Sequence, residues 1–372
     1  MTQETGQDKT AADVTADDVL DVQLAETDDI PEPVLDVTLD DELDEPLPPL
    51  ELGAGDGVPP SKGVPQGSLL IRSLPLQMLV AGAIGGFLGW LLQESGARER
   101  EVAGGFRGMG ELLLEMGCFG AVAGGSVGLF VSSAEWLVAG VWLRAAKAGL
   151  AGLIAGALGG TAGGALGQAL FTLILPAETS GLWGTGGTVV ARALGWALVG
   201  SCVGVGPGIA ERAPGRIANG LFGGLAGGFA GGLLFDPVGW IFADVAGIGG
   251  GPSRLIGTML VGGCSGLGVG LVAQMAKQVW VCIHGGPLSG KQFILYEFPA
   301  TVGRSPQAHV PLTRDKQVGL EHCIIERQGT RHRLRAVLPT RVNGRARQTA
   351  LIRDGDRIEL GASTLEFRER AV

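Results

Sequence analysis

Between residues 72 and 277, long stretches without any Asp, Glu, Lys or Arg alternate with short charged or Pro/Gly-rich turns. Each stretch approaches the length that an α-helix needs to cross a hydrocarbon layer about 30 Å thick, at about 1.5 Å of rise per residue. Residues 71–277 are therefore predicted to form an all-α polytopic membrane bundle of about six Gly-rich helices. A shorter apolar segment, 136–143, is predicted as an interfacial helix or as a continuation into the next span. The predicted spans are 73–93, 116–134, 148–177, 193–210, 217–235 and 255–276.

Glycines four residues apart recur within every predicted span. Residues four apart share one face of a helix, and a face without side chains lets two backbones approach closely. Such packing matters in a bilayer, because lipid tails are as apolar as Leu and give helices little other reason to associate. The glycines expected at helix contacts are Gly120, Gly124, Gly128, Gly156, Gly160, Gly200, Gly204, Gly208, Gly224, Gly228, Gly262, Gly266 and Gly270.

An internal repeat runs through the predicted spans. The segment LVGSCVGVGPG at 198–208 matches LVGGCSGLGVG at 260–270, and the tetrapeptide GCFG ending at Gly120 follows the same pattern. The simplest interpretation is a set of three helical hairpins related by pseudo-symmetry. Equivalent positions in the three would be held by Cys118, Cys202 and Cys264.

Ionisable groups are nearly absent from the middle of the predicted spans, where Gln168 is the main polar exception. Ion and proton pathways normally need such groups, so the pattern favours a structural anchor over a channel or transporter. Basic residues in the second and fourth loops and after the last span predict that both termini face the cytoplasm. The first loop argues against this orientation with Arg98, Arg100 and Arg107.

The first 70 residues are acidic and rich in Pro, and they are predicted to form a disordered tail. Residues 1–50 hold sixteen acids and a single base, Lys9, and they contain no aromatic residue. Such a segment cannot bury enough apolar surface to offset the entropy lost on ordering. The tail either docks on the basic C-terminal region of the chain or only keeps the protein soluble. Candidate sites for an acid-directed serine/threonine kinase are Thr15, Thr27 and Thr38.

After Gln278 the pattern changes to short runs of β-forming residues bounded by Gly and Pro, which predicts an all-β sandwich over 278–372. Within it, the segments ATVGRS, EHCII and LIRDGDRIELG follow one another in the order of the forkhead-associated (FHA) domain, which this region resembles. The resemblance implies a module that binds phosphothreonine peptides through loops at one end of the sandwich. Charge-assisted hydrogen bonds hold the phosphate in such modules.

The resemblance also implies roles for single residues. Arg304 matches the phosphate-binding arginine, and His322 matches the histidine that supports the loop. The family's phosphate-binding Ser is replaced by Gly319 and the adjacent Arg by Leu320, while the loop that reads Asn-Gly-Thr in the family reads Leu-Pro-Thr from Leu338. Each lost charged hydrogen bond is expected to cost about 1.5–3 kcal/mol. The candidate phosphopeptide-binding residues are Arg304, Ser305, Arg314, Lys316, Gly319 and Asn343.

Catalytic and metal-binding chemistry finds no support in the sequence. The five cysteines form no CxxC or Cys/His pattern, no Ser/His/Asp constellation stands out, and the Asp-Gly-Asp at 354–356 is typical of a turn. We therefore expect no enzyme activity, no metal and no cofactor.

The parts together predict a membrane-anchored signalling protein. Its cytoplasmic FHA-like domain is expected to dock a protein partner, with phosphorylation of that partner on Thr left open. The alternative is a channel or transporter whose helical bundle is regulated by the domain. The lipid bilayer and a serine/threonine kinase are further expected partners, nucleic acid is not, and homo-oligomerisation stays open.

Overall fold

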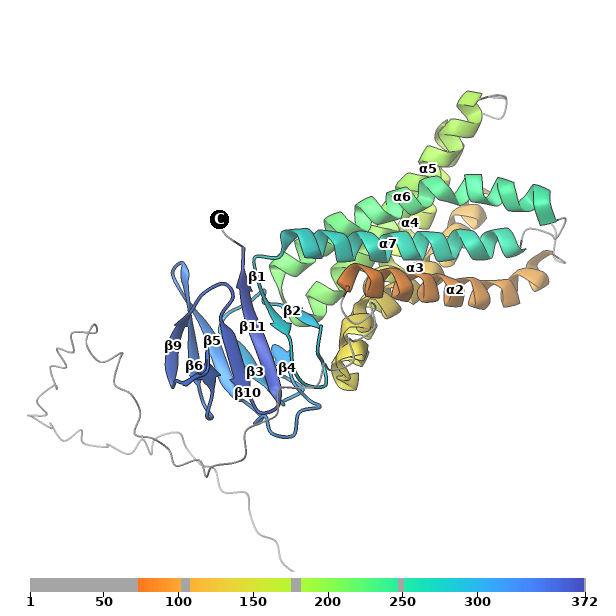
Figure 1. Ribbon diagram of the computed structural model, residues 1–372. Helices are drawn as coiled ribbons and strands as arrows, with labels where there is room; N and C mark the ends of the chain where they lie inside the picture. Colours follow the sequence, from red (N-terminus) through yellow and green to blue (C-terminus); the bar gives the residue numbers. More distant parts are fainter. Residues whose placement is uncertain (1–72, 102–107, 175–181, 247–250, 371–372) are drawn as a thin grey trace, which may run out of the picture. The chain divides into compact units, whose positions relative to one another are not determined.

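The computed structural model describes residues 73–101, 108–174, 182–246 and 251–370. The tail with Thr15, Thr27 and Thr38 lies outside the described residues, as does the end of the predicted span 148–177. The described helices and strands belong to one compact unit. They form a helical bundle followed in sequence by a β-sandwich, which confirms these two parts of the predicted fold class (Figure 1).

In the described part of the chain, six long helices each contain a segment that is long and apolar enough to cross a membrane. Apart from Ser73, which precedes α2, the six charge-free windows fall inside these helices as far as they are described. The helices are α2 (Leu74–Glu101), α3 (Met109–Ala139), α4 (Trp142–Ile174), α5 (Leu182–Glu211), α6 (Pro214–Ala246) and α7 (Gly251–Ala276).

The segment 136–143 is neither an interfacial helix nor part of one continuous span. Helix α3 ends at Ala139, Gly140 turns the chain with φ = 75°, and α4 begins at Trp142. A glycine in this left-handed conformation commonly ends a helix, because it has no Cβ to strain. The glycine, and not the length of the apolar run, therefore separates the two spans.

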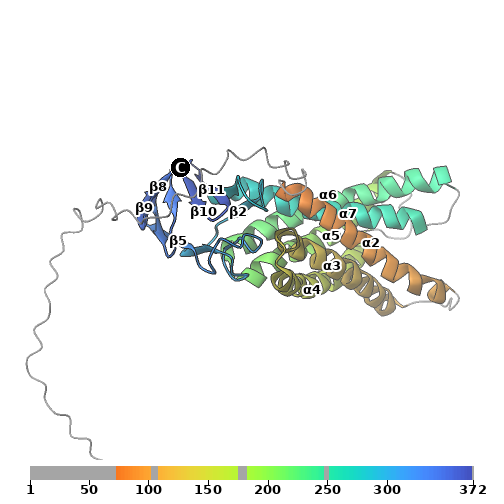
Figure 2. The same ribbon diagram turned by 60° about the horizontal axis from the view of Figure 1, so that its bottom comes forward.

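Each helix packs against two neighbours, so that the six form a closed ring in the order α2, α3, α4, α5, α6, α7 and back to α2. Figure 2 shows the helices running side by side. Glycines meet face to face where α3 packs on α4, α5 on α6 and α2 on α7. At every glycine that the sequence singled out, an added methyl group would overlap backbone atoms of the neighbouring helix. Examples are Gly120 with Gly160, Gly124 with Gly156, Gly204 with Gly220, and Gly262 with Gly82.

The three tight helix pairs are not three hairpins, because α2 and α7 are the first and last of the six described helices, and the three cysteines are not equivalent. Cys202 and Cys264 each lie against a glycine of the preceding helix. The corresponding place in α3, against Gly85 of α2, is held by Ser126, while Cys118 lies eight residues earlier and is exposed. The predicted equivalence of Cys118 is therefore wrong. Because the glycines recur every four residues, shifting the alignment of one span against another by eight residues leaves the glycine pattern unchanged.

Charged side chains of the bundle lie in two layers. In α5, nineteen residues separate Arg192 from Glu211, which corresponds to about 28 Å along the helix axis. This is close to the thickness of a hydrocarbon core, and the helix segments between the layers carry no Asp, Glu, Lys or Arg. The layer next to the sandwich contains Glu135, Arg144, Glu211 and Arg216, and the distal layer contains Glu94, Arg192, Asp236 and Arg254.

The C-terminal strands form two sheets packed face to face. One sheet has the strand order β2-β1-β11-β10-β7-β8 and the other β4-β3-β5-β6-β9, and the pairing is antiparallel except between β3 and β4. The strands are β1 (Val279–Ile283), β2 (Gln292–Ile294), β3 (Ala300–Gly303), β4 (Val310–Pro311), β5 (Cys323–Gln328), β6 (Arg331–Ala336), β7 (Arg341–Val342), β8 (Arg345–Ala346), β9 (Thr349–Ile352), β10 (Arg357–Leu360) and β11 (Ser363–Glu369).

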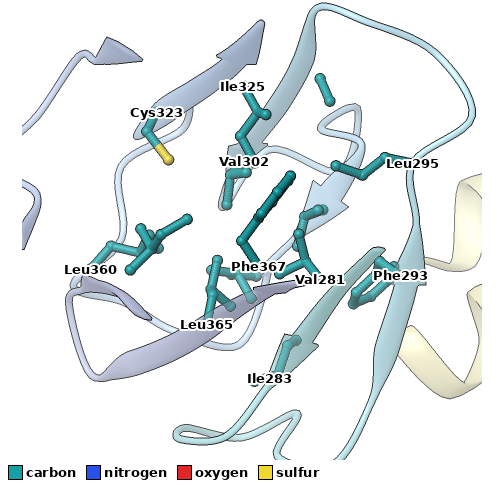
Figure 3. Close-up of a cluster of buried hydrophobic side chains, with 14 of the residues drawn as sticks. Val281, Ile283, Phe293, Leu295, Val302, Cys323, Ile325, Leu360, Leu365 and Phe367 are labelled. Atoms are coloured by element: carbon teal, nitrogen blue, oxygen red, sulfur yellow. The ribbon is translucent and has the colours of Figure 1, made fainter. Parts of the chain in front are cut away.

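Alternate residues of the central strands point between the two sheets. Val281 and Ile283 of β1 and Leu365 and Phe367 of β11 are fully buried, while their neighbours along each strand are less buried. Figure 3 shows these side chains meeting Val302, Ile325 and Leu360 in one apolar core. This period of two is what a half-buried strand requires, and it leaves the loops at the ends of the sandwich free to carry function.

Candidate functional site

Two loops at one end of the sandwich are held together by main-chain hydrogen bonds. The N–H of Arg304, directly after β3, donates to the carbonyl oxygen of Gly319 at 2.7 Å. The next N–H, that of Ser305, donates to the carbonyl oxygen of Leu320 at 3.0 Å. The segment that resembles the family's phosphate-binding strand end therefore lies beside the segment in which Gly319 replaces the family's phosphate-binding serine. We call this end of the sandwich, residues 304–320 and 337–340, the recognition end.

The buried side chain of His322 connects the two loops of the recognition end. Its side chain is buried, its Nδ1 accepts a hydrogen bond from the N–H of Gly319 (3.2 Å), and its Nε2 lies 3.1 Å from the carbonyl oxygen of Pro339. Because Nδ1 accepts, the ring proton sits on Nε2 and is donated to Pro339. The structure thus places His322 where a supporting role requires it.

Leu338 occupies the space next to Gly319. A Cβ atom built on Gly319 would overlap the Cδ1 atom of Leu338. In this chain, Leu338 of the other loop therefore takes the space that a side chain at position 319 would need. Leu338 remains 40% exposed, and Leu320 (62%) and Val337 (51%) are exposed beside it. The recognition end consequently presents an apolar patch where the family presents polar groups.

Arg314 and Lys316 are exposed because the residue between them is anchored. Asp315 is buried, and its carboxylate accepts hydrogen bonds from the N–H of Gln317 (3.0 Å), the N–H of Ala362 (3.0 Å) and the hydroxyl of Ser363 (2.7 Å). Because the Asp315 side chain is held inside the domain, the side chains of Arg314 and Lys316 on either side of it are exposed to solvent. Asp315 was missed in the sequence, since a single acid between two bases has no distinctive pattern.

Asn343 lies in a turn and uses its amide there. Its Nδ2 donates to Asp356 at 2.9 Å, and its Oδ1 accepts from the N–H of Arg357 at 2.9 Å. With φ = 53°, Asn343 adopts a left-handed conformation that Asn tolerates better than most residues. The structure therefore ties Asn343 to the β9–β10 turn and does not bring it together with Arg304.

The junction between the helices and the sandwich holds a buried charge cluster that the sequence did not reveal. Arg216 of α6 forms ion pairs with Glu135 of α3 (2.6 Å) and Glu211 of α5 (2.5 Å). The indole N–H of Trp136 also donates to Glu211, at 3.0 Å. Glu135 and Arg216 are 81 positions apart in the chain, so no local sequence pattern predicts their ion pair.

Lys291 extends this cluster from the sandwich side. It is only 2% exposed, and its Nζ donates to the main-chain carbonyl oxygen of Glu135 at 2.6 Å. Burial lowers the pKa of Lys291 to about 8, with the nearby Glu135 opposing the shift. Burial also raises the pKa of Tyr296 to about 12.

The recognition end itself contacts the helical bundle. Arg144 of α4 donates to the carbonyl oxygen of Ala308 at 3.0 Å and to that of Gln307, both in the loop that begins at Arg304. The guanidinium of Arg314 lies against Gly140, in the turn between α3 and α4. The loop that begins at Arg304 is therefore braced by the end of the bundle.

Residues 300–361 match the sequence profile of the FHA domain family. No curated protein matches the chain. An FHA domain solved for a study of phosphothreonine-dependent interactions is 27% identical, with a TM-score of 0.24, over 26% of this chain and 100% of that chain. The FhaA FHA domain, solved in complex with the intracellular domain of Rv3910, is 29% identical, with a TM-score of 0.22, over 24% of this chain and 99% of that chain.

A third solved structure, the FHA domain of CT664 from Chlamydia trachomatis, is 17% identical, with a TM-score of 0.24, over 26% of this chain and 100% of that chain. The matched residues span β3 to the end of β10 and include both loops bridged by Arg304 and Gly319. The C-terminal sandwich is therefore an FHA domain, a phosphothreonine-binding module, carried on the same chain as six helices long enough and apolar enough to cross a membrane.

Proposed function

We propose that this chain is a membrane-anchored interaction protein, without enzyme activity, whose FHA domain binds a protein partner at the recognition end. The observation that carries the proposal is the pairing of the Arg304 and Gly319 main chains, which supports Arg304 as the arginine that would bind the phosphate. Arg304, Arg314 and Lys316 supply positive charge at this end. Guanidinium groups suit phosphate because they donate two parallel hydrogen bonds.

The partner's chemistry follows from what surrounds Arg304. The hydroxyl donor of the family is absent at Gly319, and the neighbouring surface consists of Leu320, Val337 and Leu338. A phosphothreonine peptide would therefore lose one hydrogen bond and gain apolar contact. We infer a partner segment in which a phosphorylated threonine stands next to a large apolar side chain.

The orientation in the membrane follows from charge and helix number. An even number of spans places the segment before α2 and the FHA domain on the same side of the bilayer. Basic residues that follow or end the spans on this side, such as Arg144, Lys147, Arg216 and Lys277, support a cytoplasmic orientation by the positive-inside rule, against which the arginines of the first loop count. A cytoplasmic kinase acting on Thr15, Thr27 or Thr38 would then create ligands on the same side as the recognition end.

The test is a peptide library presented to the full-length chain in lipid nanodiscs, with each sequence offered with Thr and with phosphothreonine. The library includes the segments around Thr15, Thr27 and Thr38. Selection of phosphorylated peptides with an apolar residue near the phosphothreonine supports the proposal. Equal selection of both forms would remove phosphate recognition from it and leave a scaffold that binds by apolar contact alone.

A further inference from the structure

A pocket of about 380 Å³ lies among five of the six described helices, at the level of the distal charge layer. Its wall comes from α3, α4, α5, α6 and α7. Aromatic rings line it continuously, since Trp196 lies 6.2 Å edge-on from Phe119 and 6.1 Å in a stacked arrangement from Phe235. Polar groups at the pocket are those of Gln168, Arg192 and Arg254.

The pocket exists because α4 and α5 move apart. At Gly163 an added Cβ would lie 2.7 Å from the carbonyl oxygen of Gly195, so the helices are in tight contact there. One turn later, at Gly167, an added Cβ would come no closer than 3.5 Å to Gly195, which is an ordinary contact distance. Helix packing therefore does not require glycine at 167, and the missing side chain leaves the pocket open.

The two arginines at the pocket retain donors for an anion. Arg192 pairs with Asp236 through one guanidinium nitrogen and lies over the ring of Phe235, 5.6 Å from its centroid. Arg254 pairs with Glu94 at 3.2 Å. A guanidinium carries five N–H groups, and in each arginine one nitrogen makes the ion pair: Nη1 of Arg192 donates to one oxygen of Asp236, and Nη2 of Arg254 donates to both oxygens of Glu94. Both side chains are more than 40% exposed, so the remaining groups are accessible.

The pocket is charged at one end and apolar further along α5, as a phospholipid is charged at its head group and apolar along its hydrocarbon chains. Arg192 stands at the depth of the distal charge layer, and Val199, seven residues along α5, lines the pocket about 10 Å deeper. An anion at Arg192 would therefore lie at the membrane surface, and an attached hydrocarbon chain would run past Trp196 toward the bilayer centre. A free inorganic anion would leave the aromatic wall unused.

We propose that the pocket binds one anionic phospholipid, with its phosphate between Arg192 and Arg254 and one hydrocarbon chain along Trp196 and Val199. The site lies in the bundle and is independent of the recognition end. It gives the helices a ligand of their own and goes beyond their role as an anchor.

Native mass spectrometry of the full-length chain, released from detergent, tests the proposal. The three probes are phosphatidylglycerol, phosphatidylcholine with the same acyl chains, and inorganic phosphate alone. We expect a single phosphatidylglycerol to be retained at least about tenfold more strongly than phosphatidylcholine, with no retention of phosphate. Equal retention of the two lipids would overturn the proposal and indicate unspecific annular lipid, and retention of phosphate alone would assign an ion site without a lipid.

Two variants locate the site. Gly167→Leu fills the pocket, and Gly186→Leu, on an exposed face of α5 with nothing within 4 Å, is the matched control. Retention of phosphatidylglycerol should fall at least about tenfold in the first and stay unchanged in the second. Should Gly167→Leu fail to fold, as judged by its thermal unfolding, Arg254→Gln decides by the same loss. Wild-type retention in a folded variant contradicts the assignment.

Discussion

The side chain of Leu338 lies where a side chain at position 319 would have to be, so that Gly319 and Leu338 fit together as a pair. Replacing the glycine alone forces the end of the half-exposed Leu338 side chain to turn aside, and a displaced rotamer costs about 0.5–1.5 kcal/mol. We therefore expect Gly319→Ser to lower the free energy of unfolding by that amount, and Leu338→Ala in the same chain to restore most of it.

A double-mutant cycle by chemical unfolding measures this coupling. Leu320→Ala is the matched control, because Leu320 is also exposed at the recognition end and is not the residue that fills the space at Gly319. Additive effects of the serine and the alanine would contradict the pairing of Gly319 with Leu338. The double variant also restores a hydroxyl, so it should bind phosphothreonine peptides more tightly than the wild-type chain.

Replacing glycine by alanine should affect the stability of the bundle differently at two positions in α3. A methyl group at Gly120 would overlap the carbonyl oxygen of Gly160, whereas nothing lies within 4 Å of one at Gly110. Gly120→Ala should therefore destabilise the bundle by about 1–3 kcal/mol, while Gly110→Ala should be neutral or stabilise it by up to about 1 kcal/mol. Helix content followed during titration with a denaturing detergent gives both values. Equal effects would argue against close backbone packing between α3 and α4.

Arg216 neutralises two buried carboxylates at the junction. Removing one member of a buried ion cluster leaves uncompensated charge and costs about 3–5 kcal/mol. Arg216→Met should therefore destabilise the chain strongly, and Lys147→Met, which removes an exposed charge nearby, should have little effect. Adding Glu135→Gln and Glu211→Gln to Arg216→Met should recover part of the loss. No recovery would mean that Arg216 acts through packing and not through charge.

The pKa of Lys291, lowered from 10.5 to about 8, makes stability depend on pH. Between these two values the folded side chain is neutral while the unfolded one still holds its proton, so the unfolded state binds more protons and stability rises with pH. Relative to Lys291→Met, the wild-type chain should gain about 1–3 kcal/mol between pH 8 and pH 10. Tyr296 begins to act in the opposite direction above pH 10, because its pKa is raised from 10.0 to about 12. A difference between the two proteins that stays constant over this range would show that Lys291 is not buried as described.

The helices and the sandwich could be predicted because their signals are local. Absence of charge over about 20 residues identifies a span, and short apolar runs between glycines identify strands. The turn between α3 and α4 was not predicted, because it depends on the left-handed conformation of Gly140, which cannot be read from the sequence. The register of the repeat was also ambiguous, and the choice of Cys118 over Ser126 shows how a motif with period four can slip.

The candidate site was predictable only in part. The motif order located Arg304, Gly319 and His322, which the structure brings together. It did not show that Leu338 fills the space at Gly319, that Asp315 anchors the segment between Arg314 and Lys316, or that Asn343 bonds to the β9–β10 turn. The Glu135–Arg216–Lys291 cluster was missed entirely, because its members come from three separate elements and meet only in the folded chain.

The central claim is that the recognition end binds a phosphorylated partner through Arg304 despite the loss of the family's serine. Titration calorimetry of the full-length chain in nanodiscs, with the best phosphothreonine peptide from the library and its unphosphorylated form, tests it directly. Arg304→Ala is compared with Arg331→Ala, an exposed arginine at the start of β6 outside the recognition end. We predict that phosphorylation strengthens binding by at least about tenfold and that only Arg304→Ala abolishes this gain. Equal affinity for the two peptides, or a gain that survives Arg304→Ala, would contradict the claim.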